Sequence, residues 1–210
     1  MAGSIEATRR QQARYDGQAR YYDFAESPME ALAFFGLRQR LWSMVGGPRL
    51  LEIGVGTGRN VRYYPPDTRV VALDLSPQML KRAVRLAARL GRRIDFLLAD
   101  AEHLPFRAGA FDTVLATLVF CSVPDPVGGL REAARVAAPA GRVLLLEHVR
   151  AGGARLGRLM DALNSFVARA AGENINRDTT ANVRAAGLRV EREESYRMGI
   201  VRLLHARPKG

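Results

Sequence analysis

The stretch from residue 50 to residue 60, LLEIGVGTGRN, constrains the fold of this chain more than any other. An apolar run ends there in three glycines at alternate positions, Gly54, Gly56 and Gly58, and Glu52 precedes them. Glycine admits left-handed backbone conformations and, because it has no Cβ, lets a ligand approach the main chain closely. We therefore expect a strand, a tight loop that cradles a small molecule, and the start of a helix. The spacing differs from the G-x-G-x-x-G of dinucleotide-binding loops, and no Lys-Ser or Lys-Thr pair follows, as a P-loop requires.

A second apolar run, residues 70–73, ends in an acid, Asp74, about twenty residues after Gly54. In doubly wound folds an acid at this offset binds the hydroxyls of a ribose, and a carboxylate accepts from two hydroxyls through two charge-assisted hydrogen bonds. The alternative role of Asp74 is to cap the following helix, but Ser76 and Pro77 already supply a helix start. We favour the ligand-binding role.

Strand-like and helix-like segments alternate along the rest of the chain, which predicts a parallel sheet with helices on both faces. The expected strands are residues 49–55, 70–75, 94–99, 111–119, 142–149, 188–196 and 200–207. The expected helices are a short one after residue 55 and longer ones within 78–90, 127–137, 156–171 and 177–186. The last two strands must pair antiparallel, since only a short Met198-Gly199 link joins them. We predict an α/β fold with a doubly wound, Rossmann-like, seven-stranded sheet, mostly parallel with an antiparallel last strand.

The chain divides into an N-terminal helical segment, residues 1–45, and a main part, residues 46–210, within one compact domain. Large apolar residues recur at helical spacing in the first part, and Gly46-Gly47-Pro48 ends it. We expect this segment to act as a lid over the ligand; the alternative is that it is a helix which only caps the core.

The E-x-G-x-G-x-G pattern resembles the first motif of class I S-adenosylmethionine (SAM)-dependent methyltransferases, and further segments match that family in order. Asp100-Ala101-Glu102, after the third expected strand, resembles the segment that holds adenine in the family. The resemblance implies SAM as the cofactor, and we expect no metal site. It implies that the cofactor-binding residues are Tyr22, Glu52, Gly54, Gly56, Gly58, Asp74, Leu75, Met79, Asp100, Ala101, Glu102, Thr117 and Leu118.

Within that family the chain resembles the bacterial phospholipid N-methyltransferases and quinone C-methyltransferases and their thiol-methylating relatives. The segments that carry this likeness are Tyr15-Asp16, Tyr22-Asp23, VFCSV at 119–123, LEHV at 146–149 and NINR at 174–177. The implied acceptor-side residues are Tyr15, Cys121, His148 and Asn176. Cys121-Ser122 replaces the Arg-Asn pair usual in the quinone enzymes, which favours an amine or a thiol acceptor.

Our first expectation for the acceptor is the amine of a phosphatidylethanolamine-like headgroup, with a thiol or a quinone as alternatives. SAM brings its own leaving group, so the protein mainly positions the reactants. A hydroxyl or carbon acceptor would also need a base, for which His148 is the candidate; its alternative role is a histidine satisfied by a neighbouring carbonyl. We interpret Cys121 as a pocket-lining or buried thiol, because no Cys-His signature accompanies it.

Composition limits the remaining classes of function. The net charge is +11, yet no zinc spacing or RNA-binding motif is present, so we expect no nucleic-acid partner. A single cysteine and the lack of an apolar run of roughly 18 residues predict a cytoplasmic protein, which could contact an anionic membrane through its N-terminal segment. A nicotinamide-dependent oxidoreductase would need the longer glycine spacing and a Tyr-x-x-x-Lys pair. This chain has neither, so we do not expect this class of enzyme. A SAM-binding protein without transfer activity stays open, as does the oligomeric state.

Overall fold

The computed structural model describes residues 2–21, 34, 36–151, 153–170 and 174–209. The strands are β1 (Arg49–Ile53), β2 (Arg69–Asp74), β3 (Asp95–Leu98), β4 (Phe111–Thr117), β5 (Ala137–His148), β6 (Leu188–Tyr196) and β7 (Val201–Pro208). The α-helices are α1 (Ala2–Gln18), α3 (Leu37–Trp42), α4 (Pro77–Arg89), α5 (Pro126–Val136), α6 (Ala154–Ala170) and α7 (Thr179–Ala185). Two short 3₁₀ helices are η2 (Val61–Tyr63) and η3 (Arg197–Gly199).

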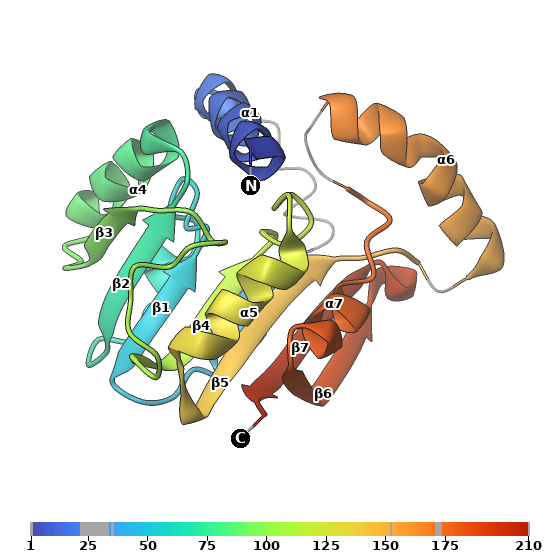
Figure 1. The fold of residues 1–210 in the computed structure, drawn as a ribbon. Helices are drawn as coiled ribbons and strands as arrows, with labels where there is room; N and C mark the ends of the chain where they lie inside the picture. Colours follow the sequence, from blue (N-terminus) through green and yellow to red (C-terminus); the bar gives the residue numbers. More distant parts are fainter. Residues whose placement is uncertain (1, 22–33, 35, 152, 171–173, 210) are drawn as a thin grey trace.

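The seven strands form one sheet in the order β3-β2-β1-β4-β5-β7-β6. The neighbouring strands from β3 to β5 pair in parallel, whereas β7 runs antiparallel to both β5 and β6 (Figure 1). The chain order reverses between β1 and β4, and a doubly wound sheet binds its ligands beyond the carboxyl ends of the strands at such a point. The predicted fold class is confirmed.

Successive residues of the central strands feed two separate cores, because side chains alternate between the faces of a sheet. Val143 and Leu145 of β5 pack on the face covered by α5 and α7. Leu144 and Leu146 pack on the opposite face, against α3 and η2. The inner strands are therefore apolar on both faces, as in buried parallel sheets.

Helix α4 begins where the Ser-Pro pair predicts, since the Ser76 hydroxyl accepts a hydrogen bond from the Met79 amide. Other helix and strand boundaries differ from those predicted from the sequence. The predicted helix after residue 55 is only the three-residue η2, and α7 begins at Thr179 rather than at 177 because Asp178 caps it. Strand β5 begins at Ala137 instead of 142, since the chain runs directly from α5 into the sheet and pairs with Phe111 across a register shift.

The N-terminal segment is described in two parts. Helix α1 lies beyond the carboxyl edge of the sheet, over the cleft described below (Figure 1). Helix α3 instead belongs to the core, where Leu41 and Trp42 pack with Phe34. Residues 22–33, which hold much of the predicted lid, lie outside the described residues, and the division of the chain at residue 45 stays a prediction. No helix in the described part of the chain has the length and apolar character needed to cross a bilayer.

Candidate cofactor and acceptor site

All three glycines of the loop after β1 have the left-handed backbone that favours glycine, with φ of 70° at Gly54, 56° at Gly56 and 92° at Gly58. Their surroundings differ. A Cβ on Gly54 would lie 2.4 Å from a methyl group of Val119, and one on Gly58 would lie 3.1 Å from Cα of Ala83 in α4. A Cβ on Gly56 would meet nothing within 4 Å. Two glycines thus let chain segments approach each other, and Gly56 borders open space.

Asp74 connects the glycine loop to the start of α4. One carboxylate oxygen accepts from the Gly56 amide at 2.8 Å, and the other accepts from the Ser76 amide at 2.9 Å. Burial raises the pKa of Asp74, while these amide donors act in the opposite direction. Because Ser76 is the residue that caps α4, the alternative role of Asp74 as the helix cap is not seen.

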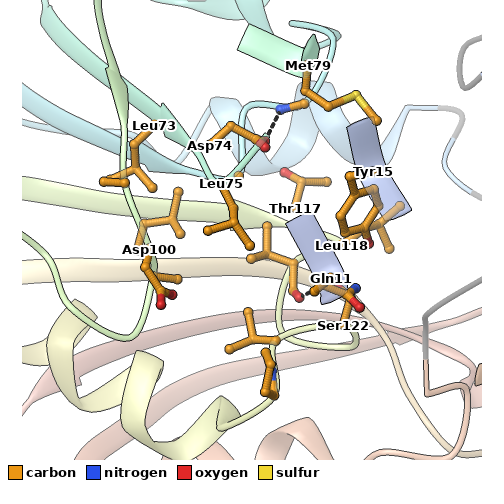
Figure 2. A pocket seen from close by; sticks show the side chains of 18 residues that line it. Gln11, Tyr15, Leu73, Asp74, Leu75, Met79, Asp100, Thr117, Leu118 and Ser122 are labelled. Atoms are coloured by element: carbon orange, nitrogen blue, oxygen red, sulfur yellow. Dashed lines mark hydrogen bonds between the residues drawn. The ribbon is translucent and has the colours of Figure 1, made fainter. Parts of the chain in front are cut away.

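A cleft opens at the carboxyl ends of β1, β2, β3 and β4, with α1 on its other side, and it encloses about 700 Å³ including the part open to solvent. Figure 2 shows Tyr15 and Gln11 of α1 near Leu118, with Asp74 and Asp100 lying on the strand side. The predicted site residues that line the cleft are Tyr15, Gly54, Gly56, Asp74, Leu75, Met79, Asp100, Ala101, Thr117 and Leu118. The structure therefore gathers these residues around one cavity.

Several lining residues were not predicted. They are Gln11, Ile53, Leu73, Ala99, Val119, Ser122, Val123 and Pro124. Helical spacing offered one signal, because Gln11 lies four residues before Tyr15 and so falls on the same side of α1. The segment 119–124 follows β4, and its place in the family resemblance was the only hint that it borders the ligand.

Glu52 lies beneath the glycine loop and does not line the cleft. It is fully buried, and its carboxylate accepts from Asn60 Nδ2 at 2.6 Å and from the Tyr64 hydroxyl. Arg38 of α3 donates in turn to Asn60 Oδ1 at 2.8 Å. Burial raises the pKa of Glu52 to about 7. Glu52 thus connects the strand end before the glycine loop to the residues around η2, and through Asn60 to α3.

Glu147, which is buried, and Arg177, which is partly buried, both bind the loop after β4. Glu147 Oε1 accepts from the amides of Val119 and Phe120, each at 3.0 Å. Arg177 Nη1 donates to the carbonyls of Phe120 and Val123 at 2.7 and 2.6 Å. Burial raises the pKa of Glu147 to about 7 and lowers that of Arg177. The loop after β4, part of which lines the cleft, is therefore held by two residues that do not line the cleft themselves.

The other predicted site residues that the structure describes do not line the cleft. His148 is on the other face of the sheet from Glu147, its Nδ1 is buried without a hydrogen-bond partner, and burial lowers its pKa. Cys121 is buried, while Asn176 donates to Asp161 and Glu102 accepts from the Asp125 amide. Gly58 packs on α4, and Tyr22 lies outside the described residues. Within the described part of the chain, no three His, Cys, Asp or Glu residues gather as metal ligands.

Comparison with known proteins agrees with this geometry. Residues 51–145 match the family model described as "Methyltransferase domain". The chain is 40% identical over 106 residues to a human thiol S-methyltransferase, TMT1A, covering 49% of this chain and 43% of that protein. It is 36% identical over 104 residues to a phosphatidylethanolamine N-methyltransferase of Cereibacter sphaeroides, covering 49% and 51%. A demethylmenaquinone methyltransferase of Thermus thermophilus is 40% identical over 102 residues, covering 47% and 46%.

Among solved structures, the putative methyltransferase bound to the Haloferax volcanii Trm112 activator matches with a TM-score of 0.70 at 20% identity, covering 93% of this chain and 98% of that one. The [4+2]-cyclase SpnF matches with a TM-score of 0.67 at 22% identity, covering 84% and 80%. These likenesses concern the fold. The chain spans about half the length of the curated relatives that it matches.

The fold, the cleft and the family match together show that this chain contains a class I SAM-dependent methyltransferase domain. SAM is the cofactor of this class of domain, so the predicted family and cofactor are confirmed. A cyclase with the same fold shows that the fold alone does not fix the reaction.

Proposed function

We propose that this chain transfers the methyl group of SAM to a nucleophile that reaches the cleft already ionised, a thiolate. The observation that carries this proposal is the chemistry of the cleft lining. Its only titratable side chains are Tyr15, Asp74 and Asp100 among the described residues. Among the described residues, the lining holds no histidine or lysine that could take a proton from the acceptor, and the two carboxylates lie on the strand side of the cleft.

The residues around the cleft fit SAM. We place its ribose hydroxyls at Asp74, its adenine beside Asp100 and Ala101, and its aminoacyl part at the glycine loop. Each oxygen of Asp74 already accepts one amide, and a carboxylate oxygen has a second lone pair for a hydroxyl. When bound, SAM supplies an activated methyl group together with its own leaving group.

The protein then contributes by orienting the two reactants. The Val119 backbone, held by Glu147, borders the acceptor side, and α1 covers the cleft with Gln11 and Tyr15. Such positioning of two reactants contributes on the order of 7 to 11 kcal/mol in well-oriented systems. In this proposal α1 acts as a lid that excludes water, and residues 46–210 form the transfer domain.

A phospholipid amine is the second candidate acceptor. It is supported by the net charge of +11, which attracts anionic lipid surfaces, and by the 36% identity to a phosphatidylethanolamine N-methyltransferase. A quinol carbon would need a base, and His148 lies outside the lining of the cleft. A quinol acceptor, with His148 as its catalytic base, therefore has less support than a thiolate or a phospholipid amine.

The test is product analysis with labelled SAM and three separate acceptors: benzenethiol, phosphatidylethanolamine vesicles and a demethylated menaquinol. We expect methylated thiol as the main product. A main product from the vesicles would favour the second candidate. SAM binding without any product would overturn the proposal and leave a SAM-binding protein without transfer activity.

A further inference from the structure

Helix α6 exposes an unusual amount of apolar surface. Leu159 is 54% exposed, Leu163 47% and Phe166 71%. These residues are spaced i, i+4 and i+7, so they lie along one side of the helix; we call them the apolar stripe. A different side of α6 meets the protein, because Met160 is buried and Asn164 accepts from the Ile175 amide.

The body of the protein holds α6 by polar contacts rather than by a shared core. Asp161 pairs with Arg150 at 2.8 Å, and Arg14 of α1 donates to the carbonyl of Ala168 at 3.1 Å. None of the described side chains of α6 belongs to the three core clusters. A helix in a soluble environment is normally stabilised by burial of its apolar side, and the stripe of α6 lacks that cover.

The stripe has basic surroundings and lies at the edge of the sheet that carries the cleft. Helix α6 follows the carboxyl end of β5 and extends beyond that edge, as α1 does (Figure 1). Arg158, next to Leu159, is exposed. The sequence of α6 holds three arginines and one aspartate, and that aspartate is paired with Arg150.

Another exposed apolar side chain, on a different element, occurs at the same edge. Met198, in η3, is 84% exposed and follows the exposed Arg197. The Val149 amide donates to the carbonyl of Ile200 at 2.9 Å, which places η3 beside the chain that leads into α6. Exposed apolar side chains with a neighbouring arginine thus occur on both α6 and η3, at the edge of the sheet that carries the cleft.

We propose that the apolar stripe of α6 docks this molecule on an anionic lipid bilayer, with the helix lying in the interface and the edge that carries the cleft facing the membrane. Interfacial helices combine Leu and Phe on one side with basic residues beside them, and anionic leaflets attract arginine. The net charge of +11 adds to this attraction.

A second copy of the chain is a poorer occupant. A stable interface between proteins buries about 800 Å² on each partner, from roughly 20 to 30 residues. Three side chains on one helix supply only a small part of that, whereas a bilayer accepts shallow insertion of a few side chains.

Helix α1 is less suited to this role, although it belongs to the N-terminal segment for which the sequence suggested membrane contact. Its exposed described side chains include Glu6, Arg9 and Arg10. Arg10 is paired with Glu6 at 2.7 Å. No large apolar side chain is exposed along the part of α1 whose side chains are described.

Vesicle co-sedimentation tests the proposal without relying on methyl transfer. The test variant carries Leu159→Gln, Leu163→Gln and Phe166→Gln, which keep helix formers on α6. The matched control carries Val84→Gln, Leu90→Gln and Leu98→Gln, which are 45%, 46% and 53% exposed around α4 and β3. Each protein is mixed with phosphatidylcholine vesicles, with and without phosphatidylglycerol, and its fold is checked by circular dichroism.

We expect the wild type and the control to bind the anionic vesicles alike, and the test variant to bind about tenfold more weakly or worse, since apolar insertion supplies much of such affinity. Arg158→Gln should weaken binding to the anionic vesicles only. Equal binding by the test variant and the control would overturn the proposal. The proposal would also be overturned if the wild type does not bind vesicles and if light scattering shows that the wild type forms dimers whereas the test variant does not.

Discussion

Glu147 and Phe120 are 27 residues apart in sequence, and the carboxylate of the first accepts a 3.0 Å hydrogen bond from the amide of the second. Both groups are buried, and the other oxygen of Glu147 has no partner. Arg177 holds the same peptide region through the Phe120 carbonyl. The loop at 119–123, which borders the cleft, is therefore held by these long-range polar contacts in addition to its own turn hydrogen bonds from Ser122 and Val123 to the Val119 carbonyl.

This dependence predicts different effects for two substitutions of Glu147. Glu147→Ala should lower the free energy of unfolding by about 2 to 4 kcal/mol, because it leaves the buried amides of Val119 and Phe120 without an acceptor. Glu147→Gln keeps an oxygen at the Oε1 position and should lose less than half as much. Urea unfolding of the three proteins measures this. Equal losses for Ala and Gln would show that the amide contacts do not stabilise the loop.

The buried carboxyl of Glu52 predicts a pH dependence of stability. Its pKa rises from an ordinary value of 4.5 to about 7 in the folded protein, so folding favours the protonated form. The stabilisation is complete below pH 4.5 and is lost as the pH rises through 7. Glu52→Gln removes this titration, and its stability relative to the wild type should rise by up to about 3 kcal/mol from acid to alkaline pH.

The measurement is urea unfolding of the wild type and Glu52→Gln at several pH values. Glu147 also titrates near pH 7, but it does so in both proteins, so its effect cancels in the difference. Parallel pH curves for the two proteins would contradict the raised pKa of Glu52.

The sequence predicted best what is decided locally. The glycine spacing and the acid at the end of β2 specify a turn and a strand end, and both border the cleft as expected. Side-chain direction was harder to predict, because it depends on the register of each strand. Glu52 lies two residues after Leu50, so its side chain is on the same face of the sheet as that of Leu50, beneath the glycine loop. His148 lies two residues after Leu146 and is on the same face as Leu146 for the same reason. Neither residue lines the cleft.

Contacts between distant segments could not be predicted from the sequence. Nothing in the local pattern of NINR at 174–177 shows that Arg177 reaches the loop 119–123. The exposed stripe of α6 was equally hidden, since the apolar pattern of residues 156–171 is the one expected of a helix that packs on a core. Which helix side is covered depends on tertiary packing.

Two left-handed glycines, one crowded and one with open space around it, predict a contrast between Gly54→Ala and Gly91→Ala. Both positions have a left-handed backbone, with φ of 70° and 63°, so both variants should be less stable by about 1 to 2 kcal/mol. Only at Gly54 would the new Cβ collide with another residue, Val119 at 2.4 Å. Because Val119 lines the cleft, we expect weaker SAM binding for Gly54→Ala alone, measured by calorimetry. Unchanged SAM affinity for both variants would mean that the cleft tolerates a shift of Val119.

Asp74→Ala should weaken SAM binding about tenfold or more, because it removes at least one charge-assisted hydrogen bond worth about 1.5 to 3 kcal/mol. The matched control is Asp95→Ala, which removes an exposed carboxylate paired with Arg69 at the opposite edge of the sheet. Its SAM affinity should equal that of the wild type. If calorimetry gives the same dissociation constant for Asp74→Ala and Asp95→Ala, the ribose does not bind at Asp74.

The contacts of Asp16 allow a test of whether α1 acts as a lid. Its carboxylate accepts from the Ser76 hydroxyl at 2.5 Å and from the Gln78 amide at 3.3 Å, so it joins α1 to the start of α4 just beyond Asp74. Gln11 and Tyr15 on the same helix line the cleft. Asp16→Ala should therefore let α1 open more often and raise the rate at which SAM dissociates, by roughly the tenfold that corresponds to 1.4 kcal/mol of lost anchoring.

The control for Asp16→Ala is Glu6→Ala, which removes an exposed ion pair with Arg10 on the same helix. Exposed pairs of this kind contribute about 0 to 1 kcal/mol, and this one does not reach α4, so SAM should leave that variant at the wild-type rate. Stopped-flow displacement of bound SAM measures the rates, and hydrogen exchange of the α1 amides reports how often the helix opens. Faster exchange in α1 with no change in SAM dissociation would show that α1 is anchored at Asp16 but does not retain the cofactor.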